Sequence, residues 1–228
     1  MKQLALELAS PPVPTLDNFV AGDNAEVVAA LRALARGEGN ERFVYLWGGA
    51  GSGRTHLLHA VLREWRIAGR VVHLHAANDL PAAGAVAARD AVAVDDVQLL
   101  PPPAQIELFN IINNLREYTG VMLVTGDVPP ARLPLRADLL TRLAWGLVYE
   151  VRALSEVDRR AAVRDYAAAR GFALPQEVID YLLARAPRDL SSLRALVDTL
   201  DRLSLEQKRA ITVPLARELL QAAPLNNR

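Results

Sequence analysis

The sequence is constrained most by a glycine-rich segment that lies between an apolar run and a helical pattern. The segment reads Gly48-Gly49-Ala50-Gly51-Ser52-Gly53-Arg54-Thr55. It departs at one position from the phosphate-binding loop G-x-x-x-x-G-K-[ST]. Residues 43–47 before it are typical of a buried strand, and residues 56–62 after it have helical periodicity. Glycines here let backbone N–H groups point at a polyphosphate, and the new helix adds the positive end of its dipole. The segment therefore predicts a nucleotide site at a strand-to-helix turn.

The departure is Arg54, which stands where phosphate-binding loops carry lysine. Arginine keeps the charge but is a planar fork and not a compact ammonium, so the exchange is not neutral. Only two of the 26 basic residues are lysines, which accounts for part of the exchange. Thr55 can place its hydroxyl on a magnesium ion. We expect nucleotide binding with doubtful hydrolysis; the alternative is a glycine-rich turn without a ligand.

Composition excludes several classes of protein. The 228 residues are 51% hydrophobic and 23% charged, as in an ordinary globular protein, and a formal net charge of zero argues against general nucleic-acid binding. Without cysteine the chain has neither disulfides nor a thiolate zinc site. No apolar run approaches the roughly 18 residues of a membrane span, and the N-terminus does not read as a signal peptide. We expect a cytoplasmic protein without a membrane partner.

The chain divides into three parts. Residues 1–15 read as a short tail with a proline-rich linker, residues 16–152 as an α/β domain and residues 153–228 as a small all-helical domain. Strands are expected near 43–47, 70–75, 91–95, 120–125 and 146–151. Helices are expected near 25–36, 54–68, 104–117 and 138–143, and then at 155–169, 175–185, 189–203 and 213–222. The alternation predicts a five-stranded parallel sheet covered by helices on both faces.

Carboxylates follow two of the expected strands. Asp95 and Asp96 end the third strand, about 40 residues after the glycine-rich loop. In phosphate-loop proteins the first such acid holds magnesium and the next can orient a hydrolytic water. Asp127, or Thr125 beside it, follows the fourth strand and could face the γ-phosphate side. A plain strand-ending turn is the alternative for this last position.

Single residues of other types give weaker signals. Arg142 closes a short helix before the fifth strand and Arg188 opens a helix of the C-terminal domain; for either, a solvated surface arginine is the alternative. The histidine pairs, at 56 and 59 and at 73 and 75, lack a third ligand nearby, so zinc is not expected. Trp145, like the other two tryptophans, is most simply a core or half-buried anchor.

With these motifs in view, almost the whole chain resembles the AAA+ ATPases, within the group of the replication initiator DnaA and its shorter regulatory relative Hda. The resemblance makes residues 48–55 the Walker A loop and Asp95–Asp96 the end of the Walker B strand. It implies that residues 17–24 lie over the adenine and that Asp127 is sensor 1. It also implies that Arg142 is an arginine finger acting in trans and that Arg188 is sensor 2.

Two features place the chain nearer to the Hda side of the group. The sequence ends shortly after the expected lid, where DnaA continues into a helix-turn-helix domain. The N-terminal tail resembles the peptide by which Hda binds the β sliding clamp of DNA polymerase III. The tail residues that match this peptide are Gln3, Leu4, Leu6 and Leu8. Glu7 replaces a proline often present there.

The resemblance implies a regulator of replication initiation and not an enzyme on its own account. It implies ADP (or ATP) with Mg²⁺ in the chain's own site, binding to the DNA-loaded clamp, and stimulated hydrolysis of DnaA-bound ATP, which prevents re-initiation. DNA would be reached through the clamp, and self-association is a further possibility. One alternative is a self-standing ATPase, such as a DnaA-like assembly factor or helicase loader. A DNA-binding module is a third, disfavoured by the neutral charge.

Overall fold

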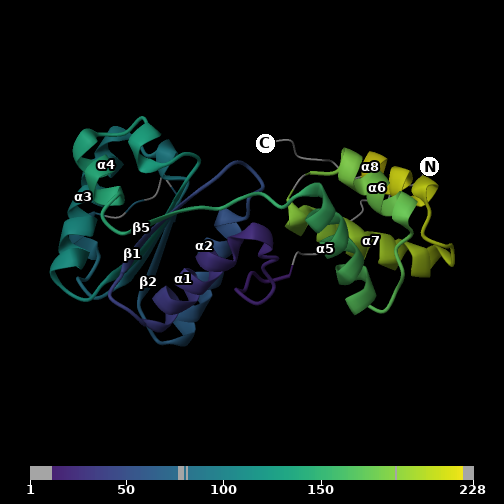
Figure 1. The fold of residues 1–228 in the computed structure, drawn as a ribbon, viewed down its shortest axis with the longest axis horizontal. Helices are drawn as coiled ribbons and strands as arrows, with labels where there is room; N and C mark the ends of the chain where they lie inside the picture. The colour runs from purple at the N-terminus through teal and green to yellow at the C-terminus, as the bar shows by residue number, and fades with distance from the viewer. Residues whose placement is uncertain (1–11, 77–79, 81, 188, 223–228) are drawn as a thin grey trace. The chain divides into compact units, whose positions relative to one another are not determined.

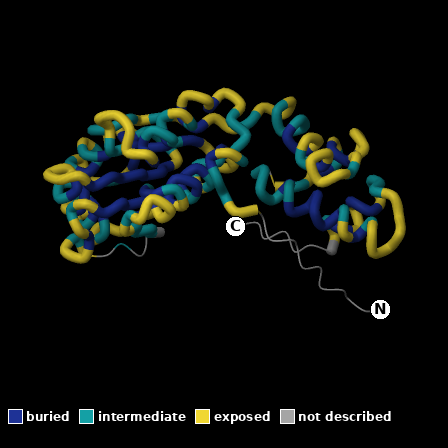
Figure 2. Tube along the Cα trace, turned by 90° about the horizontal axis from the view of Figure 1, so that it is seen from below, coloured by how far each residue is buried: buried dark blue, intermediate teal, exposed yellow. Residues whose placement is uncertain are grey.

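The computed structural model describes residues 12–76, 80, 82–187 and 189–222. The chain forms two compact units, of which one comprises residues 14–153 and the other begins at Leu154. Each has its own hydrophobic core and is described separately (Figures 1 and 2). Within these described ranges no helix is long and apolar enough to cross a bilayer.

The first unit is built on a five-stranded parallel sheet. The strands are β1 (Phe43–Trp47), β2 (Val72–Ala76), β3 (Ala91–Asp95), β4 (Val121–Gly126) and β5 (Leu147–Glu150). Their order is β2-β3-β4-β1-β5, and every pairing is parallel. Trp47 pairs with Gly126, so β1 and β4 end at the same level and their carboxyl ends share one edge. The predicted sheet is therefore confirmed.

Helices cover both faces of this sheet. They are α1 (Ala25–Arg36), α2 (Arg54–Ile67), α3 (Pro102–Glu117) and α4 (Ala137–Leu143), and short 3₁₀ turns lie at Gly22–Asn24, Ala83–Ala85, Val97–Leu99 and Pro130–Arg132. Figure 1 shows α1 and α2 on one side of the strands and α3 and α4 on the other. Because strand side chains alternate, Val44 and Leu46 enter the core beneath α1 and α2, whereas Tyr45 enters the opposite core.

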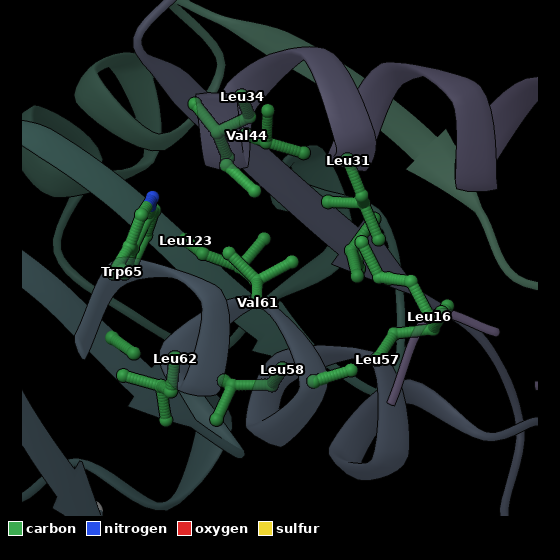
Figure 3. Close-up of a cluster of buried hydrophobic side chains, with 14 of the residues drawn as sticks. Leu16, Leu31, Leu34, Val44, Leu57, Leu58, Val61, Leu62, Trp65 and Leu123 are labelled. Carbon is green, nitrogen blue, oxygen red and sulfur yellow. The ribbon is translucent and has the colours of Figure 1, made fainter. Parts of the chain in front are cut away.

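The core beneath α1 and α2 is fully apolar. Leu31 of α1 and Leu57, Leu58 and Trp65 of α2 have no exposed surface. Figure 3 shows these side chains converging on Val44 and Leu123 from the sheet. This packing fixes α2 against the sheet, and with it the loop from which α2 begins.

The segment before α1 is tied to the carboxyl edge of the sheet by a buried asparagine. The Asn24 side-chain amide donates to the carbonyl oxygens of Ala21 and Arg152, and the Arg152 N–H donates to Asn24 Oδ1, at 2.8–3.0 Å. Arg152 lies two residues beyond the carboxyl end of β5. The segment is therefore held beside the end of the sheet that carries the glycine-rich loop.

The second unit is a four-helix domain. Its helices are α5 (Glu156–Ala169), α6 (Gln176–Arg185), α7 (Leu190–Gln207) and α8 (Val213–Ala222). Ser155 and Asp189 cap the first turns of α5 and α7 by accepting backbone N–H bonds. One apolar cluster joins the four helices through residues such as Val163, Ile179 and Leu215.

Candidate nucleotide site

The glycine-rich loop has the backbone conformation that its sequence predicts. Gly51 and Gly53 have φ of 76° and 98°, a left-handed region that side chains disfavour. A Cβ at Gly48 would overlap the carbonyl oxygen of Val151, whereas one at Gly49 would meet open space. Gly53 is also the N-cap of α2, so the loop opens directly onto the helix N-terminus. This is the geometry of an anion cradle.

An aromatic ring from the N-terminal segment covers this loop. A Cβ at Gly53 would lie 2.7 Å from Cε2 of Phe19, and the Phe19 ring lies 5.5 Å from the His56 ring, centroid to centroid. His56 Nε2 in turn forms a hydrogen bond with the Thr15 carbonyl oxygen, at 3.0 Å. The resemblance pointed to residues 17–24 as a whole, but it did not single out Phe19. Asp17 of the same segment is exposed and pairs with Arg32 at 2.7 Å.

Hydroxyl and carboxylate oxygens meet at the carboxyl edge of the sheet. Thr55 Oγ1 donates to Asp95 Oδ2 at 2.9 Å, and the buried Thr125 hydroxyl donates to the other carboxylate oxygen of Asp95. Asp96 N–H donates to Thr125 Oγ1 at 2.9 Å. The structure thus brings Thr55 and Asp95 together as predicted. It gives Thr125 the task of orienting Asp95, which motif matching did not identify.

These oxygens fit a magnesium ion held jointly with a nucleotide. Mg²⁺ prefers hard oxygen ligands and usually takes only one or two from the protein, with phosphate and water supplying the rest. Thr55 and Asp95 offer such a pair next to the cradle. Among the described residues no cluster of three histidine, cysteine or acidic side chains could hold a metal by itself.

Arg54 is buried beside the second acid of the Walker B strand. Its Nη2 lies 3.5 Å from Asp96 Oδ1, and its side chain is 12% exposed against 41% for Asp96. Its Nη1 is buried and, like Ser52 Oγ in the same loop, has no hydrogen-bond partner in the described part of the chain. Gln98 Nε2 also donates to Asp96 Oδ1, at 3.1 Å. The loop therefore holds unused buried donors, as an anion site requires, and Asp96 already has two donors on one oxygen.

Asp127 is exposed at the carboxyl end of β4, above a buried tyrosine. Tyr45 donates its hydroxyl to the Val128 carbonyl oxygen at 2.8 Å, and a Cβ at Gly126 would overlap that hydroxyl. Burial raises the pKa of Tyr45 far above its usual value; the Asp127 carboxylate adds to the rise and Arg54 opposes it. Tyr45 thus fixes the turn that presents Asp127, a role not foreseen from the sequence.

Arg142 lies at the other edge of the sheet. It belongs to the last turn of α4, just before β5, and lines a small cavity with Phe43 and Met122, at the amino ends of β1 and β4. The glycine-rich loop follows the carboxyl end of β1. At roughly 3.3 Å per residue, the five residues of β1 separate the two by about 16 Å.

The Arg142 guanidinium is stacked on aromatic rings. Its guanidinium carbon lies 3.7 Å from the Trp145 ring centroid and 5.2 Å from that of Phe109. Its buried Nε has no hydrogen-bond partner among the residues described. By contrast, Arg136 makes two hydrogen bonds to Asp138, of 2.8 and 3.1 Å, which raise the pKa of Arg136.

Other predicted positions lie outside the site or outside the described residues. Arg188 and the tail residues Gln3, Leu4, Leu6 and Leu8 are not among those the structure describes. Gly49 and Ala50 are exposed at the tip of the loop. His73 pairs with Asp90 on the edge strand, with Nε2 2.7 Å from Oδ2.

Comparison with known proteins places both units. Residues 156–220 match the family model described as the lid domain of Hda. Domain III of the Thermotoga maritima replication initiation protein DnaA shares 24% identity, with 93% of this chain and 98% of that chain covered and a TM-score of 0.75. AMPPCP-bound DnaA from Aquifex aeolicus shares 24% identity, with 87% and 70% covered and a TM-score of 0.70. Thermotoga maritima RuvB, at 18% identity, covers 91% and 71% with a TM-score of 0.66.

These findings confirm the AAA+ fold and the resemblance to the Hda and DnaA group. They also identify α5 to α8 as a lid domain of the Hda type.

Proposed function

We propose that this chain, a DnaA-related AAA+ protein with a Hda-type lid, regulates replication initiation by stimulating hydrolysis of the ATP bound to DnaA. In this proposal ADP and Mg²⁺ occupy its own site, and the β sliding clamp loaded on DNA holds it in place. The observation that carries the proposal is the position of Arg142 at the edge of the sheet opposite to the chain's own loop.

Distance separates Arg142 from the chain's own nucleotide site. About 16 Å of strand separates the two, whereas a group that stabilises a transferring phosphoryl must contact it. An arginine finger supplied by a second protein stabilises the charge that develops on the phosphoryl oxygens. Arg142 has no carboxylate partner among the described residues, whereas nearby Arg136 is committed to Asp138. Arg142 is therefore the better finger of the two.

The proposed resting state has ADP in the chain's own site. The cradle formed by residues 48–53 and the N-terminus of α2 suit the α- and β-phosphates, and Thr55 with Asp95 would hold magnesium. Arg54 is paired with Asp96, the acid that would orient a hydrolytic water. This pairing supports slow or absent intrinsic turnover. We assign Asp127 to the γ-phosphate side and Arg188 to the lid contact with nucleotide.

The clamp contact rests on the sequence of the tail. An extended peptide ahead of a proline-rich linker is suited to binding in a groove, and Gln3, Leu4, Leu6 and Leu8 are the residues assigned to that contact.

The test is an assay of DnaA ATP hydrolysis with this protein added, in the presence of DNA-loaded clamp, free clamp or no clamp. We expect stimulation that depends on the loaded clamp, with little phosphate released when DnaA is omitted. Brisk hydrolysis by this chain alone, without an effect on DnaA, would instead favour the self-standing ATPase.

A further inference from the structure

Trp145 carries a guanidinium group on each face of its indole ring. The guanidinium carbon of Arg142 lies 3.7 Å from the ring centroid and that of Arg116 lies 3.8 Å from it. Two guanidinium groups this close to one centroid would overlap if they shared a face, so they lie on opposite faces. Their carbons are separated by no more than the sum of the two distances, about 7.5 Å. The result is a three-layer stack of arginine, tryptophan and arginine.

Both outer layers are anchored to helix ends. The Trp145 N–H donates to the Arg142 carbonyl oxygen at 3.1 Å, where α4 ends. Arg116 lies in the last turn of α3, and the guanidinium of Arg42 fixes the end of that helix. Arg42 donates, at 2.6–3.3 Å, to the carbonyl oxygens of Leu115, Arg116, Tyr118 and Gly120. The stack is therefore assembled from fixed backbone.

Stacking occupies the flat face of the Arg142 guanidinium and leaves its N–H edge for other partners. Neither Arg142 nor Arg116 forms an ion pair with a carboxylate in the described ranges. Nε of Arg142 is buried without a partner, and its terminal nitrogens make no hydrogen bond to a described residue. A guanidinium edge matches two oxygens of a phosphate group in its own plane. A long side chain whose plane is already fixed loses less conformational freedom when it docks.

We propose that Trp145 is a positioning residue for Arg142, and that Arg116 completes the stack by holding the other face of the indole. The group received at the exposed edge of Arg142 is a phosphate of the triphosphate bound to a neighbouring protein. This inference rests on the proposed function of Arg142 as a finger in trans.

The test measures DnaA ATP hydrolysis against the concentration of this protein, at saturating DNA-loaded clamp. For Trp145→Leu we expect the maximal stimulated rate to fall about tenfold while the half-saturating concentration changes less than about twofold, because orientation is lost and docking is kept. Trp145→Phe should retain most of the rate, since a smaller aromatic face remains. Arg116→Ala should lower the rate about threefold, since the cation–π support of one face is lost.

Arg185 provides a matched control for Arg116. It also ends a helix, α6, and its guanidinium carbon lies 4.6 Å from the Tyr181 ring centroid, but it belongs to the lid. Arg185→Ala should leave both parameters unchanged. Thermal melting checks that each variant folds. If Trp145→Leu does not fold, Trp145→Phe and Arg116→Ala carry the test.

A second readout needs no DnaA. The indole ring current should shift the Arg142 side-chain protons upfield in the unaltered protein, and Trp145→Leu should abolish that shift. Absence of stimulation by the unaltered protein would reject the proposed function. Loss of the ring-current shift with normal or faster stimulation by Trp145→Leu would reject the positioning role alone, because the stack would then be idle or restraining.

Discussion

Replacing Arg142 with alanine should abolish the effect on DnaA and leave the chain's own nucleotide site intact. Loss of an arginine finger lowers hydrolysis by about 10³-fold or more, because the transition-state charge loses its partner. The chain's own site should not respond. Across about 16 Å of water, one unit charge contributes roughly 0.3 kcal/mol, and screening beyond a Debye length of about 8 Å reduces this further. The affinity for ADP should therefore change less than about twofold.

The same substitution should cost little stability. It removes stacking on Trp145, worth about 0.5–1 kcal/mol at a partly exposed site. It also removes a buried Nε that has no partner in the described part of the chain, a situation that costs about 1–3 kcal/mol. Because these contributions oppose each other, the free energy of unfolding should change by no more than about 1 kcal/mol, or about 2–4 °C in Tm.

Three measurements on Arg142→Ala check this reasoning: the DnaA ATPase assay with loaded clamp, a calorimetric titration with ADP, and a thermal melt. Arg136→Ala is the matched control, since it removes a neighbouring arginine that is paired with Asp138. Unfolding of Arg142→Ala would make Arg142 a structural residue. Full stimulation by Arg142→Ala, with loss in Arg136→Ala, would move the finger to Arg136.

Three further outcomes are expected. The unaltered chain should bind ADP at least as tightly as ATP in calorimetric titrations, and Arg54→Lys should raise both ATP affinity and turnover; a clear ATP preference before substitution would contradict this. Replacing Gln3 and Leu4 with alanine should abolish clamp binding in a titration while ADP affinity is kept, and unchanged clamp affinity would exclude the docking peptide. Gly48→Ala should lower Tm because its Cβ would overlap a backbone carbonyl oxygen, an overpacking cost of about 1–3 kcal/mol, whereas Gly49→Ala should not. Equal melting of these two variants would contradict the loop geometry.

Local sequence patterns predicted most elements closely, because apolar runs bounded by glycine or aspartate leave little choice. The strands at Phe43–Trp47 and Ala91–Asp95 have the predicted bounds. The strand expected at 70–75 begins later, at Val72, because the end of α2 claims the residues before it. Gly69 adopts a left-handed φ of 75°, and the Arg70 N–H donates to the Trp65 carbonyl oxygen.

The site was predictable where its residues are neighbours in sequence and less so where the sheet brings them together. The loop and Asp95 could be located from motifs. The hydrogen bond of Thr125 to Asp95 depends on β3 lying beside β4, an order that no local pattern encodes. Phe19 covers Gly53 from 34 positions away, and Trp145 meets Arg116 only because α3 and α4 pack on the same face. Contacts of this kind follow from topology.

The two edges of the sheet favour the same choice between regulator and self-standing ATPase. At the carboxyl edge, Asp96 already accepts from Gln98 and faces Arg54, so the carboxylate that would orient water is engaged by the residue that should serve the γ-phosphate. Nucleotide bound there would act as a fixed part of the fold more than as a substrate. At the amino edge, Arg142 is oriented by aromatic stacking and has no carboxylate partner among the described residues. A self-standing ATPase would need the first of these arrangements reversed, whereas a protein that acts on a neighbour's triphosphate needs both as they are.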